Sequence, residues 1–290
     1  MVGIVALCAI AAVVAIVGGT LLLSRHETTM VAGRPGTPVI QLEVPAGSPL
    51  IQAQQLLDNK RPQPAAAAAI FRRYPSPEAQ LGLAFAEWTG PSSLGRVQEI
   101  ASANPDNPAV ALNLGWAYFQ AGRNADAASA WQQTASRFPD SPYAVDALNA
   151  LNPGVLAGLP PIVVDPGAVP AKARRDLKAG VRAWDLRHVV TARRLLDDAA
   201  ALAPDTPETL VAAAVARFSP ATPKAPFPTL GPLSGRYPNE SIVRLHLGFL
   251  LIWLKQNAKA KTQLRLAATE QPKSVYAKPA RLLLKALGQK

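Results

Sequence analysis

The chain has 290 residues, of which 49% are hydrophobic and 17% charged, so it can build a core and is not a disordered protein. Thirty Lys and Arg outnumber 19 Asp and Glu, for a formal net charge of +11, which makes anionic partners one class to consider. The single cysteine, Cys8, excludes a disulfide within the chain and a cysteine-based metal site.

Residues 2–23 are 22 consecutive residues without a charge. As a helix they would be about 33 Å long, enough to cross a bilayer core of about 30 Å. A cleaved signal peptide, a lipoprotein signal and a retained anchor are three competing interpretations. We favour the retained anchor, because no Lys or Arg precedes the run, no small-residue cleavage pattern follows it and Cys8 lies too near the start. We therefore predict a single transmembrane helix in residues 1–24.

The side of the membrane is a separate question. Arg25 and Arg34 follow the apolar run, and the positive-inside rule alone would place the rest of the chain in the cytoplasm. A single N-terminal anchor more commonly carries an exported domain, and a start codon placed too late would hide an upstream Lys or Arg. We predict a single-pass protein of the cell membrane and favour an extracytoplasmic position for its soluble domain.

Residues 25–47 show no helical period, which predicts an extended tether between the membrane and the rest of the chain. A short strand through residues 39–44 is an alternative within this segment. Three prolines interrupt the segment and are consistent with either form: Pro35, Pro38 and Pro45.

Residues 48–151 are predicted to form pairs of helices. Apolar residues recur there at helical spacing, and a polar cap followed by proline opens helices at Ser76-Pro77 and Asn107-Pro108. The most regular pair spans residues 108–139, with a turn at Gly122 that tolerates a positive φ. Prolines, which cannot continue a helix, close the successive pairs at Pro75, Pro105 and Pro139.

The pair at 108–139 resembles a tetratricopeptide repeat through Leu114-Gly115, Tyr118, Ala127, Trp131 and Pro139. The interval of 24 residues from Gly to the closing Pro recurs twice, and an Ala lies 12 residues after each Gly. We expect Gly115 and Ala127 to face each other across a close helix contact. The resemblance covers about residues 48–287 and implies an all-α solenoid of helical hairpins. The recurring intervals are Gly115 to Pro139, Gly180 to Pro204 and Gly248 to Pro272.

Five prolines in residues 152–171 forbid a helix of the usual form, so the array of repeats is interrupted there. This segment is either a hinge or insert, or a repeat whose second helix has degenerated. Repeats resume in residues 172–290 and end with a capping helix at 275–287. Before Pro238, the prolines from Pro220 to Pro232 leave room only for a loop and a short helical turn.

The sequence contains no constellation typical of catalysis, a metal site or a phosphate loop. Its three histidines, His26, His188 and His246, have no repeated ligand spacing, and packing or solvated roles are favoured for the latter two. A hydrolase with a helical lid would need a nucleophile and a base, and no such pair is evident. We predict that the protein is not an enzyme and uses no cofactor and no metal.

Basic residues concentrate at the C-terminal end, where residues 255–290 hold nine Lys and Arg against a single acid, Glu270. A solubilising surface is one interpretation, and contact with an anionic partner, such as lipid headgroups, is the other. Nucleic acid is a less favoured partner, because aromatic residues are not interleaved with these charges.

The resemblance implies that the first helix of each pair lines a concave face that holds a peptide or a partner helix. We predict a membrane-tethered scaffold or adaptor for a protein partner; the alternative is an accessory subunit of an envelope-assembly complex that serves cytochrome maturation or cell-wall assembly. For the tryptophans, an ordinary core position is the competing interpretation. The predicted partner-binding residues are Asn113, Trp116, Phe119, Arg174, Lys178, Trp184, Phe249 and Trp253.

Overall fold

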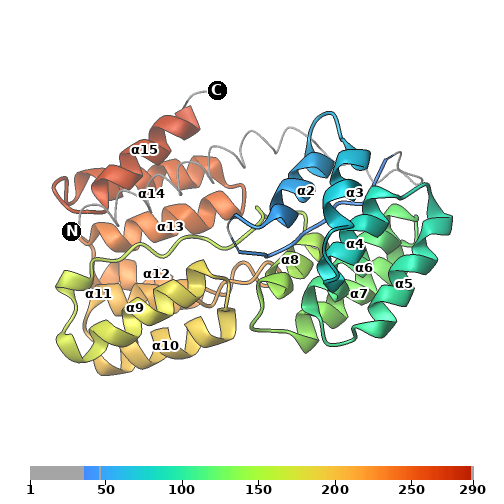
Figure 1. The fold of residues 1–290 in the computed structure, drawn as a ribbon. Coiled ribbons are helices and arrows are strands. Elements are labelled where there is room, and N and C mark those ends of the chain that lie inside the picture. Colours follow the sequence, from blue (N-terminus) through green and yellow to red (C-terminus); the bar gives the residue numbers. More distant parts are fainter. Residues whose placement is uncertain (1–35, 46, 289–290) are drawn as a thin grey trace. The chain divides into compact units, whose positions relative to one another are not determined.

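The structure is a computed structural model, and it describes residues 36–45 and 47–288 (Figure 1). Within these ranges it contains 14 α-helices, α2 to α15, two short 3-10 turns and no strand. The prediction of an all-helical chain is therefore confirmed for the described residues. The predicted anchor at 1–24 lies outside them, and none of the helices inside them is long and apolar enough to cross a membrane.

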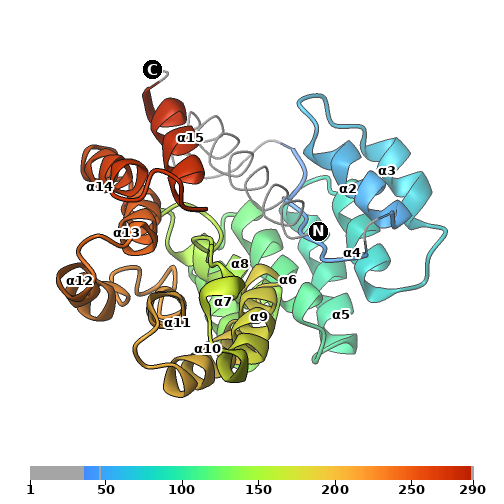
Figure 2. The ribbon, with the colours of Figure 1, turned by 90° about the vertical axis from the view of Figure 1, so that its left-hand side faces the viewer.

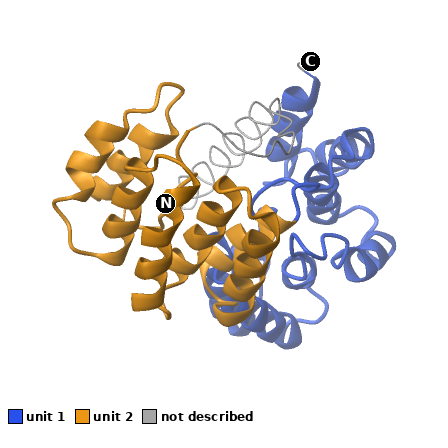
Figure 3. Cartoon of the chain, turned by 90° about the vertical axis from the view of Figure 1, so that its right-hand side faces the viewer, with its two compact units in different colours: residues 1–28, 152–290 blue, residues 29–151 orange. Residues whose placement is uncertain are grey.

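The described chain divides into two compact units, coloured separately in Figure 3. Unit 2 contains residues 36–151 and unit 1 contains residues 152–288. The boundary after Leu151 coincides with the end of the first predicted set of repeats.

Unit 2 consists of an extended segment followed by seven helices. Ser76 and Asn107 cap two of these helices, since their side chains accept hydrogen bonds from the backbone N–H groups of the first turn. Three helices end just before the prolines that were predicted to close the pairs, because proline cannot continue a helix. The helices are α2 (Pro49–Asp58), α3 (Pro64–Phe71), α4 (Pro77–Ala86), α5 (Leu94–Ala103), α6 (Pro108–Gln120), α7 (Asn124–Arg137) and α8 (Pro142–Leu151).

The residue nearest to the glycine of the central pair is Trp131. A Cβ added to Gly115 would lie 2.2 Å from Nε1 of Trp131, and its nearest neighbours are atoms of Trp131 and not of Ala127. Leu196 and Leu264 cover Gly180 and Gly248 in the same way. Trp131 makes the closest approach because a large side chain further along the second helix reaches over the glycine, and the contact of Gly115 with Ala127 stays a prediction.

Unit 1 repeats this order, with an extended segment followed by seven helices, and Figure 2 shows several of them nearly end-on. The short turn predicted before Pro238 was an underestimate, because ten residues form a helix there. Its prolines at the N-terminus remove N–H groups that have no partner within the helix, and Leu230 and Leu233 are buried. The helices are α9 (Ala171–Asp185), α10 (Val189–Leu202), α11 (Pro207–Val215), α12 (Phe227–Arg236), α13 (Ser241–Trp253), α14 (Asn257–Thr269) and α15 (Ala277–Gly288).

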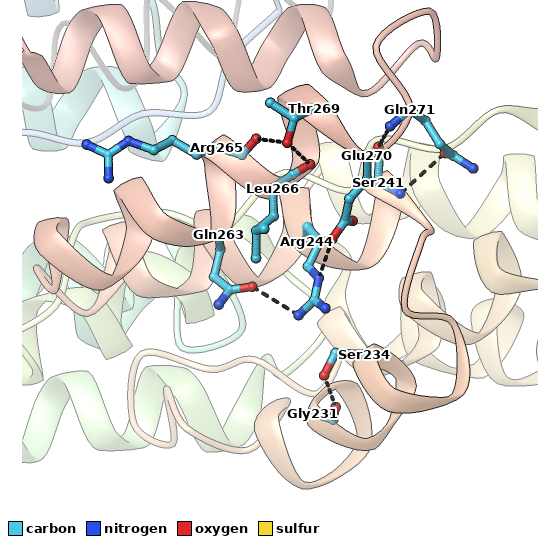
Figure 4. A network of polar contacts seen from close by, with 10 residues as sticks. All are labelled: Gly231, Ser234, Ser241, Arg244, Gln263, Arg265, Leu266, Thr269, Glu270 and Gln271. Atoms are coloured by element: carbon cyan, nitrogen blue, oxygen red, sulfur yellow. Dashed lines mark hydrogen bonds and ion pairs between the residues drawn. The ribbon is translucent and has the colours of Figure 1, made fainter.

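A polar network ties the start of α13 to the end of α14 (Figure 4). Arg244 forms an ion pair with Glu270 at 3.4 Å, and both side chains are less than one-fifth exposed. Ser241 and Gln271 exchange two hydrogen bonds, of 3.1 and 3.3 Å. The cation of Arg244 thus lies near the C-terminal end of α14, where a positive charge is favoured.

Candidate functional site: an extended segment on the inner face of each unit

The extended segment 36–45, which we call the unit 2 strap, lies within the region predicted to be a tether. Ile40 is fully buried, and Leu42 is 8% exposed; both belong to one core cluster with helix residues of unit 2. From residue 36 onward, therefore, the region predicted as a tether contributes to the core of the repeats.

Asn113 of α6 binds both the N–H and the carbonyl of one residue of the unit 2 strap, Gln41. Its Oδ1 accepts from the N–H of Gln41 at 2.9 Å, and its Nδ2 donates to the carbonyl of Gln41 at 2.8 Å. The same Nδ2 donates to the carbonyl of Ala109, and Asn113 is completely buried. A side-chain amide thus supplies the donor and the acceptor that a neighbouring strand would otherwise supply.

Further side chains hold the strap on either side of Gln41. Tyr143 of α8 accepts from the N–H of Glu43 at 2.9 Å, and Gln120 of α6 donates to the carbonyl of Gly36 at 3.0 Å. These contacts explain why residues 39–44 are extended without forming a strand: helix side chains satisfy the main chain. Two more side chains take part: Gln54 accepts from the N–H of Leu42 at 3.0 Å, and Trp116 donates to Oε1 of Gln41 at 3.1 Å.

The prolines at 152–170 belong to a second extended segment, the unit 1 strap. Two interpretations of this region were open, a hinge or insert and a degenerate repeat, and the structure shows an extended segment packed on the helices of unit 1. His246 of α13 accepts from the N–H of Val163 at 3.0 Å, and Tyr276 accepts from the N–H of Asp165 at 2.9 Å. The strap residues Leu156, Ile162 and Val169 are buried.

Two tryptophans donate to the carbonyls of the unit 1 strap. Trp184 donates to Pro160 at 2.8 Å, and Trp253 donates to Gly158 at 3.3 Å. Both indole side chains are at most 2% exposed. Each tryptophan is therefore a core residue and a ligand of the strap at once, as an amphipathic ring allows.

His246 is neutral in this arrangement. Its Nδ1 lies 2.8 Å from the carbonyl of Ile242, which can only accept, so Nδ1 carries the proton and Nε2 is free to accept from Val163. Burial lowers the pKa of His246 to about 4. Beside it along the strap, Tyr276 donates to the buried Glu208 at 3.1 Å, and burial raises the pKa of that carboxyl group.

The structure brings five of the eight predicted partner-binding residues onto the two straps. Asn113 and Trp116 contact the unit 2 strap, while Trp184, Trp253 and Arg174 contact the unit 1 strap, Arg174 through the carbonyl of Val169 at 2.8 Å. Of the other three, Phe119 packs beside Trp116 and Trp131, Phe249 is fully buried beside His246, and Lys178 is exposed.

Five strap ligands were not predicted from the sequence, namely Gln54, Gln120, Tyr143, His246 and Tyr276. Gln120 and Trp253 lie seven positions after Asn113 and His246, two helical turns further on the same face. That spacing was a usable signal for Gln120. Tyr143 lies on α8 and Tyr276 lies in the turn before α15, and only the packing of these elements brings the two hydroxyl groups to the straps.

The comparisons with known proteins concern the fold. Residues 94–151 match the tetratricopeptide repeat family. The chain is also similar to a solved structure titled "TPR2AB-domain:pHSP90-complex of yeast Sti1", with 13% identity and a TM-score of 0.34; the match covers 84% of this chain and 100% of the other. The search of curated proteins found no match. Among the described residues, no group of three or more His, Cys, Asp and Glu could hold a metal ion.

Proposed function

We propose that the protein is a scaffold without enzymatic activity that binds an extended segment of a protein partner on the inner face of a helical-repeat unit. The inner face of a unit is the helix surface that contacts its strap, through residues such as Asn113 in unit 2 and His246 in unit 1. One observation carries this proposal: both inner faces already hold an extended polypeptide, mainly through hydrogen bonds to its main chain. Main-chain contacts of this kind are used in peptide recognition, because they supply affinity while side-chain pockets supply selectivity. The match of residues 94–151 to the tetratricopeptide repeat agrees with this role.

The test is capture of partners from detergent-solubilised membranes by variants of the inner face. We expect Asn113→Ala to reduce the amount of specifically co-purified protein, because it removes both contacts to the main chain of a bound segment. Gln132→Ala is the matched control, since Gln132 is exposed on α7, outside the inner face. Equal capture by the two variants, with both folded, would place partner binding on another surface.

The scaffold is proposed to be held in the membrane by residues 2–23, on the strength of their 22 uncharged residues. Deletion of residues 1–24 should move the protein from the membrane fraction to the supernatant. Protease treatment of intact cells tests the side: digestion agrees with an extracytoplasmic position, and protection with intact controls contradicts it.

Contact of the C-terminal helices with an anionic surface is a further part of the proposal. Lys259 and Arg265 on α14, and Lys278, Arg281 and Lys285 on α15, are exposed, and the only acid in residues 255–290, Glu270, is paired with Arg244. Binding of the protein lacking residues 1–24 to vesicles that contain phosphatidylserine should weaken as salt rises. Equal binding to neutral vesicles would contradict the proposed contact with an anionic surface.

A further inference from the structure

The two inner faces hold their straps through corresponding contacts. In unit 2, Asn113, Gln120 and Tyr143 bind strap residues that are 72, 84 and 100 positions away. In unit 1, His246, Trp253 and Tyr276 bind strap residues that are 83, 95 and 111 positions away. Each separation in unit 1 is longer than its counterpart in unit 2 by the same 11 positions. The three contacted strap residues, Gly36, Gln41 and Glu43 in unit 2, therefore correspond to Gly158, Val163 and Asp165 in unit 1. The two units therefore hold an extended segment with the same arrangement of helices and contacts.

The two straps also share a sequence pattern in this register. Pro38, Ile40 and Glu43 correspond to Pro160, Ile162 and Asp165. In both straps the proline and the isoleucine are buried, and the N–H of the acidic residue binds a tyrosine hydroxyl. Both straps thus share a buried proline, a buried isoleucine two positions later and, three positions after that, an acidic residue whose N–H binds a tyrosine hydroxyl.

The side chains that hold the two straps differ in what they would expose if the strap left. Departure of either strap would uncover apolar surface, which in unit 2 is the surface around Ile40 and Leu42. The amides of Asn113 and Gln120 in unit 2 would exchange their strap hydrogen bonds for hydrogen bonds to water. In unit 1, departure of the strap would uncover the buried rings of Trp184, Trp253 and His246. Exposure of buried aromatic surface is unfavourable, so the unit 2 strap is the easier one to release.

We propose that the unit 2 strap is an internal ligand that a partner segment of the same pattern replaces, whereas the unit 1 strap is a fixed part of its core. This inference rests on the proposed function, which places partner binding on the inner face. Because the strap is part of the same chain, it competes at a high effective concentration with any free segment. The strap therefore acts as an autoinhibitory contact, and the partner gains access only when residues 36–45 are released.

Amide hydrogen exchange of the unmodified full-length protein in detergent is the first test. The strap of unit 2 should open without unfolding its helices, so the amides of Gln41, Leu42 and Glu43 should exchange at least about tenfold faster than those of α6 and than Val163 and Asp165 of the other strap. Equal protection of the two straps, or protection of residues 41–43 equal to that of α6, would overturn the proposal. The scaffold function could then still reside on another surface.

Binding of a labelled peptide with the sequence of residues 36–48 is the second test. Fluorescence anisotropy should show at least about tenfold tighter binding to Ile40→Ala/Leu42→Ala than to the unmodified protein, because the variant releases its own strap. Adding Asn113→Ala to this variant should abolish the gain. The matched control, Ile162→Ala/Val164→Ala in the unit 1 strap, should show no gain.

Three results would overturn the proposal. The first is equal binding of the peptide by the unmodified protein and the unit 2 strap variant. The second is tighter binding by the unit 1 control. The third is loss of the helical signal of unit 2 in the strap variant, which would make its strap a fixed part of the core as well. Partner capture by inner-face variants remains a separate readout, so failure here is distinguishable from failure of the scaffold function.

Discussion

Single residues decide how each strap is held, and His246 is the residue with the clearest dependence on pH. It occupies in unit 1 the place that Asn113 occupies in unit 2, and each also bonds the carbonyl four positions earlier in its own helix. The neutral imidazole of His246 can make the same two kinds of hydrogen bond as the side-chain amide of Asn113, because one ring nitrogen donates and the other accepts. Protonation would destroy the match, since both nitrogens would then be donors.

The first prediction is that acid destabilises unit 1 through His246. Its pKa in the folded protein, about 4, lies below the ordinary 6.5, so the unfolded state takes up the proton first. The contribution of neutral His246 to the free energy of unfolding is therefore fully present above about pH 6.5. It is lost as the pH drops toward 4, by about 3 kcal/mol in total. Urea unfolding at pH 7, 5.5 and 4.5 measures this loss. His246→Asn should lack this component, and an unchanged pH dependence in the variant would contradict the prediction.

The second prediction concerns Gly115. A methyl group at this position would lie 2.2 Å from Trp131, so Gly115→Ala should displace the ring and destabilise the protein by about 1–3 kcal/mol in urea unfolding. Gly95→Ala is the control: Gly95 is exposed within α5 with no atom near its added Cβ, and this change should stabilise by about 0.4–1 kcal/mol. Equal effects of the two substitutions would show that the contact with Trp131 is absent.

At the scale of the elements, a tyrosine hydroxyl joins the unit 2 strap to α8 and the unit 1 strap to the turn before α15. Tyr143 only accepts from the N–H of Glu43, which is exposed, whereas Tyr276 accepts from Asp165 and donates to the buried Glu208. Both tyrosines are buried, and the difference lies in the residues that they contact, since Glu43 is exposed and Glu208 is buried.

The third prediction follows from this difference. Tyr143→Phe should destabilise by about 0.5–1.5 kcal/mol, because water can satisfy the released N–H. Tyr276→Phe should destabilise by about 2–4 kcal/mol, because Glu208 also loses a partner while it stays buried. Urea unfolding of the two variants provides the comparison, and a larger effect of Tyr143→Phe would show that the buried hydrogen bond to Glu208 contributes little.

At the scale of the whole molecule, a unit is complete only with its strap. Residues 152–170 bury Leu156, Ile162 and Val169 against the helices that follow, so the folding boundary lies before the strap and not before α9. A sequence boundary placed at residue 172 would leave the rings of Trp184 and Trp253 without their carbonyl partners.

The fourth prediction tests this boundary with two fragments. Residues 152–288 should fold alone and melt cooperatively, whereas residues 172–288 should lose cooperative melting, because the inner face would be exposed. Circular dichroism during heating, together with binding of a hydrophobic dye, distinguishes the two states. Equal melting of both fragments would show that the strap is dispensable for unit 1.

The sequence by itself determined most of the helices, α12 excepted, because the signals that define them are local. Ser76 and Asn107 cap, prolines stop the chain, and the apolar residues of α6 and α7 recur at helical spacing. Asn113, Trp184 and Trp253 were predicted to bind a partner; they contact the chain's own straps, and their contact with a partner stays a prediction. The helix signals depend on neighbours within a few positions, and such neighbours can be read directly along the chain.

Only the tertiary structure decided that the extended segments on the inner faces belong to the chain itself. Residues 36–45 and 152–170 have no helical period, and their main-chain partners are side chains up to 111 positions away. Periodicity reports which side of a helix is apolar; it carries no information about which distant segment covers that side. For the same reason the contact of Trp131 with Gly115 was not predicted, because it depends on how far one side chain reaches across a helix pair.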